Sequence, residues 1–247
     1  MEIEESTKEN AVEVIRENMR EFVLMEREKN RTKTWNKNRV ALGNIVTNSS
    51  FTTEFVVEKA KALKNRTLSI EEYGQLQNAL IQSEDNVNSF LKVNNILFAL
   101  VRDLSSNDNA LQLCAASCSC NIALGNTKAC TSLTKSIGPY LVTELDTLNY
   151  PLLITACIRI LANTVQETSG QLAKFLLENP KYSQSDLEIL INRLLSCQYI
   201  HIRKETLWLI GNLYNHNSLD IKRIIENIIP RLSFLKQAIL STTQQYQ

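Results

Sequence analysis

A helical pattern that recurs along the chain, each time with an asparagine at the same position, most constrains the fold. The strongest copy, residues 203–213, places Asn212 four residues after Trp208, so both lie on one helical face, one turn apart. A broad ring beside an amide on one face offers both a packing surface and hydrogen bonds to an extended backbone. The apolar residues of this copy follow helical spacing; they are Leu207, Leu209, Ile210 and Leu213.

Two weaker copies of this pattern occur upstream. They occupy residues 111–123 and 152–164, with Asn121 and Asn163 in the register of Asn212. The asparagines are 42 (163 − 121) and 49 (212 − 163) residues apart. Self-similarity at such a period predicts stacked helical repeats, in which each unit buries its apolar face against its neighbours.

The chain contains few of the residues that form turns. Among 247 residues there are six glycines and four prolines. This scarcity favours long helices over many short strands, so we predict an all-α fold. The expected helices span residues 53–63, 69–82, 85–92, 93–104, 108–124, 126–137, 139–148, 151–167, 169–178, 185–197, 200–214, 219–229 and 231–240.

Local signals mark several ends of these helices. Ser69, followed by Glu71 and Glu72, predicts a capped helix start. Gly138–Pro139 predicts a break, and each proline is expected between helices or at a helix start.

A short helix, a medium helix and a longer asparagine-bearing helix then form one unit. The order predicts about three complete units, a partial unit at the start and two helices at the end.

Two parts of the chain differ in composition. Residues 1–48 form a charged arm that is acidic at first and basic later, and residues 49–247 form the repeat array. The arm is expected to be an attachment segment or a solvated tail. Its basic residues, which are interspersed with glutamates, are Arg16, Arg20, Arg27, Lys29, Arg31, Lys33, Lys37 and Arg39.

Residues 205–213 resemble the third helix of an armadillo repeat in importin α, and the layout of arm and array is most similar to the importin-α-like family labelled transmembrane-and-coiled-coil-domain. This resemblance covers roughly residues 10–240. It implies a right-handed superhelical solenoid of armadillo repeats whose third helices line a concave groove. Trp208, Asn212, Asn163 and Asn121 match the tryptophan–asparagine array that binds Lys/Arg-rich import signals in importin α, whereas Ser117 and Arg159 stand at the other tryptophan positions.

The resemblance implies an adaptor in nuclear protein import, present in cytoplasm and nucleus. The groove would bind a cargo protein or peptide, and the basic residues of the arm would bind importin β. Arg159 is expected to repel a cationic peptide. A scaffold or dedicated chaperone that holds one specific partner is the alternative. Two further alternatives stay open: Trp208 as a semi-buried core ring, and the asparagines as bridges between neighbouring helices.

The sequence gives no sign of an enzyme, a cofactor, a nucleic-acid site or a membrane segment. The net charge is +1, and His201 and His216 flank one helix without a catalytic constellation. The cysteines are expected to be reduced and to pack on apolar faces without binding a metal, because no four-ligand cluster can be assembled. They are Cys114, Cys118, Cys120, Cys130, Cys157 and Cys197.

Overall fold

A computed structural model describes residues 50–147, 149–167, 184–214 and 226 of the chain. All the regular secondary structure in this part is helical, as the sequence predicts. Within it, no helix is both long enough and apolar enough to cross a membrane. The helices are α2 (Thr53–Asn65), α3 (Ile70–Gln82), α4 (Glu84–Leu91), α5 (Ile96–Leu104), α6 (Asn109–Ile122), α7 (Thr127–Thr147), α8 (Pro151–Glu167), α10 (Gln184–Leu195) and α11 (Ile200–Tyr214).

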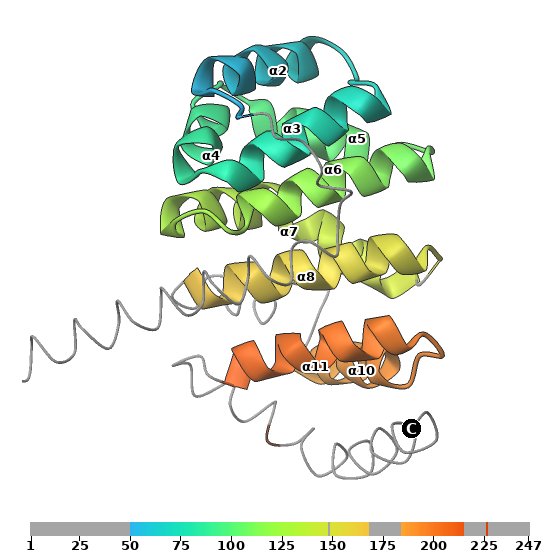
Figure 1. Ribbon diagram of the computed structural model, residues 1–247. Helices are drawn as coiled ribbons and strands as arrows, with labels where there is room; N and C mark the ends of the chain where they lie inside the picture. The colour runs from blue at the N-terminus through green and yellow to red at the C-terminus, as the bar shows by residue number, and fades with distance from the viewer. Residues whose placement is uncertain (1–49, 148, 168–183, 215–225, 227–247) are drawn as a thin grey trace, which may run out of the picture. The chain divides into compact units, whose positions relative to one another are not determined.

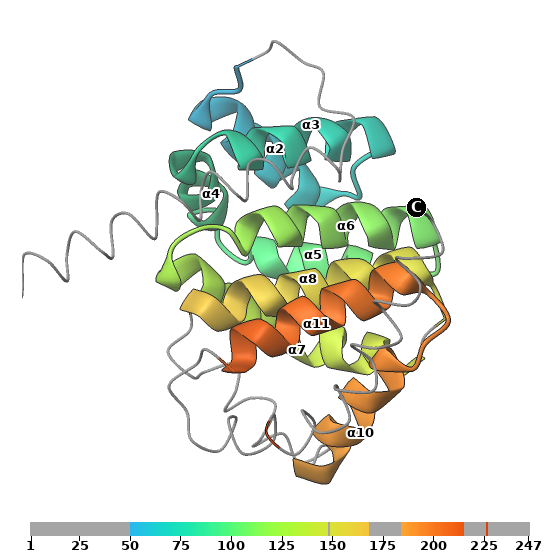
Figure 2. The same ribbon diagram turned by 60° about the horizontal axis from the view of Figure 1, so that its bottom comes forward.

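The helices repeat a simple order along the chain. α4, α5 and α6 form one complete three-helix unit, α7 and α8 form the next, and α10 and α11 belong to the one after that. α3, α6, α8 and α11 lie side by side in this order, and Figures 1 and 2 show them as one layer. We call these four the third helices, and the solvent-facing side of their layer the third-helix face.

Helix starts follow the local sequence closely. The Ser69 hydroxyl accepts a hydrogen bond from the Glu72 backbone N–H at 3.2 Å, and the Glu72 carboxylate accepts one from the Ser69 N–H at 3.0 Å. This reciprocal capping box satisfies two N–H groups that the first turn of α3 leaves without helical partners, and it confirms the predicted start. At the start of α6, the Asp108 side chain acts as a simple N-cap by accepting from the N–H groups of Ala110 and Leu111.

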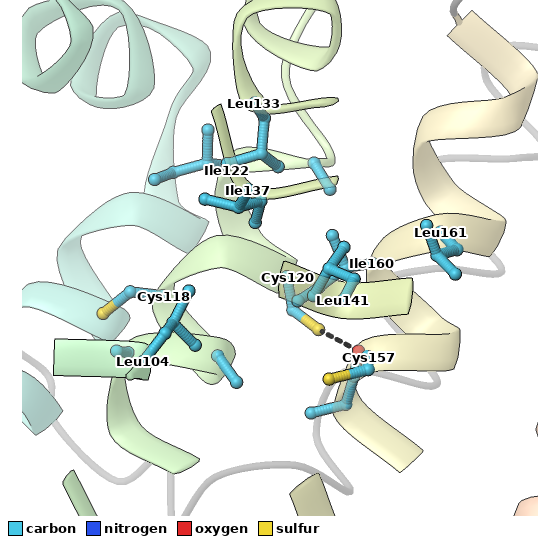
Figure 3. Packing of buried hydrophobic residues seen from close by; sticks show 14 of the residues in the cluster. Leu104, Cys118, Cys120, Ile122, Leu133, Ile137, Leu141, Cys157, Ile160 and Leu161 are labelled. Carbon is cyan, nitrogen blue, oxygen red and sulfur yellow. Dashed lines mark hydrogen bonds between the residues drawn. The ribbon is translucent and has the colours of Figure 1, made fainter. Parts of the chain in front are cut away.

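The hydrophobic core runs without interruption from one repeat to the next. Figure 3 shows its central part, where Leu133, Ile137 and Leu141 of α7 meet the inner residues of α6 and α8. Cys120 of α6 points toward α8, and its thiol donates a hydrogen bond to the Ala156 carbonyl at 3.4 Å. Because each repeat shares its core with both neighbours, the repeats stabilise one another.

One buried charge joins the first two units. Asp103 of α5 is 1% exposed, and its carboxylate accepts hydrogen bonds from Tyr73 Oη at 2.7 Å and Thr67 Oγ1 at 3.2 Å. Arg102, its neighbour in sequence, forms an ion pair with it and also donates to the Leu63 carbonyl. Burial, together with the bond to Asp103, raises the pKa of Tyr73 far above its usual value, so the phenol stays a donor.

The predicted break at Gly138–Pro139 is wrong. α7 continues through Pro139, although a proline inside a helix loses one backbone hydrogen bond and its ring crowds the preceding turn. Ile137 and Leu141, on either side of it, are both buried, so one apolar stripe spans the proline. The burial of this stripe outweighs the local preference for a break. Of the other prolines, Pro151 is the first residue of α8, where proline is tolerated.

The remaining differences concern helix ends. α5 begins at Ile96 rather than at residue 93, because Asn95 has a left-handed backbone with φ of 64° that separates it from α4. Pro180, Pro230, the arm of residues 1–48 and the predicted helices at 169–178 and 231–240 lie outside the described residues. Of the predicted helix at 219–229, only Glu226 is described, and it is helical.

We predict that Pro139→Ala raises the free energy of unfolding by about 1–2 kcal/mol. Alanine restores an N–H donor inside α7 and removes the ring clash, a gain that the greater freedom of the unfolded chain partly offsets. Urea denaturation of both proteins measures the difference. Pro151→Ala is the matched control, because an N–H at the first helical position has no intrahelical partner. A loss of stability in Pro139→Ala would contradict a continuous α7.

Candidate functional site: the third-helix face

The asparagine column of the third helices has four members in the described structure. Asn121, Asn163 and Asn212 occupy equivalent positions in α6, α8 and α11, as their shared register predicts. Asn78 holds the corresponding position in α3, and sequence reasoning missed it. Its spacing of 43 residues from Asn121 (121 − 78) is the signal that could have found it. The surrounding residues of α3 are too different from the other copies to reveal the repeat by eye.

Asn121 and Asn212 join neighbouring third helices. Nδ2 of Asn121 donates to the Gln77 carbonyl of α3 at 2.9 Å, and Nδ2 of Asn212 donates to the Ala162 carbonyl of α8 at 2.9 Å. Both accepting carbonyls belong to the residue directly before the asparagine of the preceding repeat. The two bonds are therefore one contact repeated along the solenoid. This is the bridging role that the sequence left open as an alternative to peptide binding.

These asparagines also expose little surface. Asn121 is 6% exposed, Asn163 is 4% exposed and Asn212 is 8% exposed. Their contribution to a partner is confined to the few polar atoms that reach the surface. The prediction that they form a peptide-binding row stays a prediction, and bridging is the role that the contacts define for Asn121 and Asn212.

The centre of the third-helix face is the column one turn before the asparagines. It consists of Gly74, Ser117, Arg159 and Trp208, and each of these residues is half-buried. Nothing lies within 4 Å of the point where a Cβ on Gly74 would stand, so the face is open there. Trp208 packs against the core and is partly exposed. Along this column the side-chain size therefore increases from Gly74 in α3, which has no side chain, to Trp208 in α11, which has the largest.

Arg159 is not an isolated charge. Its guanidinium forms an ion pair with Glu205 of α11, and the two side chains are 23% and 16% exposed. Burial alone would lower the pKa of Arg159, but the hydrogen bond and charge of Glu205 raise it above its ordinary value. Arg159 is therefore fully charged and largely neutralised in place. The expectation that Arg159 repels a cationic peptide stays a prediction.

The other charged side chains described on the third helices lie near the helix starts, and Glu71 and Lys204 among them are exposed. The acidic side chains described on the third helices are Glu71, Glu72 and Glu205. Glu72 is held by a bidentate contact with Arg66 at 2.7 Å and by Lys59 at 3.3 Å, which keeps the pKa of its carboxyl well below the usual range. Exposed apolar side chains lie toward the helix starts, where Ile70 is 52% exposed and Leu152 is 54% exposed. The face is thus partly apolar, with its exposed charges near the helix starts.

The cysteines behave as small core residues in this structure. Cys118, Cys120, Cys130 and Cys157 are buried, and none of the six cysteines, all of which the structure describes, forms a disulfide. Burial raises the pKa of Cys118 and Cys157 well above the usual value, so these thiols stay protonated and unreactive. Over the described part of the chain, no three Cys, His, Asp or Glu side chains lie close enough together to hold a metal ion.

Solved structures with the same helix arrangement identify the fold. A designed armadillo repeat protein in complex with the peptide (KR)4 is similar with a TM-score of 0.63 and 20% identity, over 74% of each chain. An engineered protein gives a TM-score of 0.55 at 18% identity, over 70% of this chain and 77% of that one. A second designed armadillo repeat protein gives 0.50 at 18% identity, over 72% and 84%. No protein-family model and no curated protein matches the sequence.

The class of fold follows from these likenesses and from the repeated contacts. The chain is an all-α armadillo-repeat solenoid, as the sequence predicts. Solenoids of this kind expose long surfaces built from one helix per repeat. In the described part of this chain, that surface is the third-helix face.

We predict that Asn121→Ala lowers the free energy of unfolding by about 1–2 kcal/mol. The change removes the buried hydrogen bond to Gln77 and leaves a small void between α3 and α6. Ser117→Ala is the matched control, because Ser117 lies one turn earlier on the same helix and is half-buried on the face. This control is expected to change stability by less than about 0.5 kcal/mol. Equal effects of the two substitutions on urea denaturation would contradict the bridging role.

Proposed function

We propose that this chain is a protein-binding scaffold that holds an extended segment of a partner protein on its third-helix face. The observation that carries the proposal is Trp208, the largest side chain of the central column, which is half-buried at the α11 end of the third-helix face. Aromatic residues in such settings dominate the energy of many protein interfaces. The designed relative that binds (KR)4 supports peptide binding as a use of this fold.

The dimensions of the layer favour an extended ligand. Packed helices lie about 8–10 Å apart. An extended chain advances about 3.3 Å per residue, so one third helix corresponds to about three ligand residues. A segment crossing α3, α6, α8 and α11 would therefore pass Gly74, Ser117, Arg159 and Trp208 in turn.

The affinity for a short segment should be modest. The amides of Asn121 and Asn212 already donate to neighbouring helices, so they offer the ligand backbone few further hydrogen bonds, each worth about 1 kcal/mol. Trp208 is the main apolar anchor. A partner that also uses the exposed apolar positions near Ile70 and Leu152 gains further buried area. This favours one dedicated partner with a large contact area, as expected of a scaffold or a dedicated chaperone.

The narrower proposal, an importin-α-like adaptor shuttling between cytoplasm and nucleus, ranks below the scaffold. It needs carboxylates that receive Lys or Arg side chains, and two of the three described on the third helices already hold basic residues of the chain itself. It also needs the arm of residues 1–48 to bind importin β. A pull-down with purified importin β, using the full chain and a deletion of residues 1–48, tests this. Binding that depends on the arm would move the adaptor ahead of the scaffold.

The scaffold proposal predicts that Trp208→Ala weakens binding of selected peptides at least tenfold without unfolding the protein. A displayed library of random linear peptides is selected on the immobilised wild-type chain, and enriched peptides are then titrated against the variant. Removing the ring removes the anchor and about 1–3 kcal/mol of contact energy. Thermal unfolding of both proteins separates a binding defect from a folding defect.

Phe98→Ala is the matched control for this experiment. Phe98 is also aromatic and is 68% exposed, but it lies on α5, outside the third-helix face. Its removal should leave peptide binding unchanged. If no peptide is enriched, or if Trp208→Ala binds as well as the wild type, the third-helix face is not the binding site.

A further inference from the structure

We infer that the ion pair between Arg159 and Glu205 determines the specificity of the third-helix face by excluding cationic side chains from the position beside Trp208. This inference rests on the proposed function and adds the chemical class of its ligand. The ligand is a neutral segment, and a Lys/Arg-rich peptide is rejected. Arg159 and Glu205 come from adjacent third helices, α8 and α11, so the ion pair forms only when these helices pack together in the folded array.

The geometry around Glu205 is that of a site for a basic side chain. Glu205 precedes Trp208 by three residues on α11, so the carboxylate and the ring lie on neighbouring turns of one helix. A lysine or arginine binds such a pair well, because its apolar stem packs on the ring while its charged end contacts the carboxylate. In this chain the carboxylate already holds Arg159. Arg159 thus takes the place that a basic residue of a ligand would take.

The burial of the pair makes it difficult to displace. The two side chains are only 23% and 16% exposed, so their attraction is screened less than that of a surface pair. To reach Glu205, a cationic ligand would have to break the ion pair. The positive charge of the ligand would then lie beside the positive charge of Arg159. A neutral side chain meets no such obstacle. The ion pair therefore makes binding of basic segments less favourable than binding of neutral ones. This preference requires no additional contact between the chain and a neutral segment.

The other positions of the central column agree with a neutral ligand. Gly74 and Ser117 carry no charge, and the space beside Gly74 is open to a ligand side chain. Next to them, Leu113 and Cys114 at the start of α6 are half-buried and apolar. Glu72, near the start of α3, is held by Arg66 and Lys59. Apart from the exposed Glu71 and Lys204, the described positions around the central column are therefore apolar, uncharged or already paired.

The test is a gain of binding. The probe is the peptide (KR)4, labelled with a fluorophore and titrated against the full chain. Arg159→Ser, which gives α8 the residue that α6 has at this position, should bind (KR)4 at least about tenfold more tightly than the wild type does. The double variant Arg159→Ser/Glu205→Gln should return to the wild-type affinity, because the freed carboxylate is the cause of the gain. Equal binding by wild type and Arg159→Ser, or a gain that persists in the double variant, would overturn the inference.

Glu205→Gln is the reciprocal variant, and its result tests the inference even if Arg159→Ser does not fold. It frees Arg159, so it should gain affinity for an acidic peptide of the same length as (KR)4 and none for (KR)4. The proposed function is judged separately by the selected peptides. If those peptides bind wild type through Trp208 but both single variants lack the predicted gains, the specificity inference is wrong and the scaffold function stands. If no selected peptide binds, the scaffold function itself is wrong.

Discussion

The structure depends on direct polar contacts between neighbouring third helices. Asn121 reaches the backbone of α3, Cys120 reaches the backbone of α8, and Asn212 on α11 also reaches the backbone of α8. Each contact ends on a main-chain carbonyl, whose position is fixed by its own helix. The contacts therefore set the axial offset between successive helices, which apolar packing alone leaves less sharply defined. The same axial offset brings Arg159 of α8 and Glu205 of α11 together as an ion pair on the solvent-facing side of the layer.

This packing decides which residues a partner can reach. The asparagine column turns toward the neighbouring helices and is more than 90% buried at Asn121, Asn163 and Asn212. The side chains of the column one turn earlier face outward. The residue type at this outward position varies from repeat to repeat, whereas the position one turn later is always asparagine. A scaffold needs this division, since a change in specificity at the outward column leaves the joints between repeats intact. Trp208 and the pair beside it are where this chain differs most from a uniform array.

The features that could be predicted from the sequence are those set by local interactions or by periodicity. The bounds of α11, the capping box of Ser69 and the register of three asparagines are of this kind. Pro139 was misjudged because its effect on the chain depends on burial along both halves of α7. The partner of Arg159 could not be predicted, since Glu205 is 46 residues away and meets it only when α8 and α11 pack at the observed offset.

A double-mutant cycle on Arg159 and Glu205 tests most directly that the third helices form one packed layer. The stabilities of Arg159→Ser, Glu205→Gln and the double variant are measured by urea denaturation. A half-buried pair across α8 and α11 predicts a coupling free energy of about 1–2 kcal/mol. The exposed pair of Arg193 and Asp146, whose side chains are 41% and 46% exposed, is the control and should couple by less than about 1 kcal/mol. Additive effects at Arg159 and Glu205, within about 0.3 kcal/mol, would show that the two helices do not pack in this register.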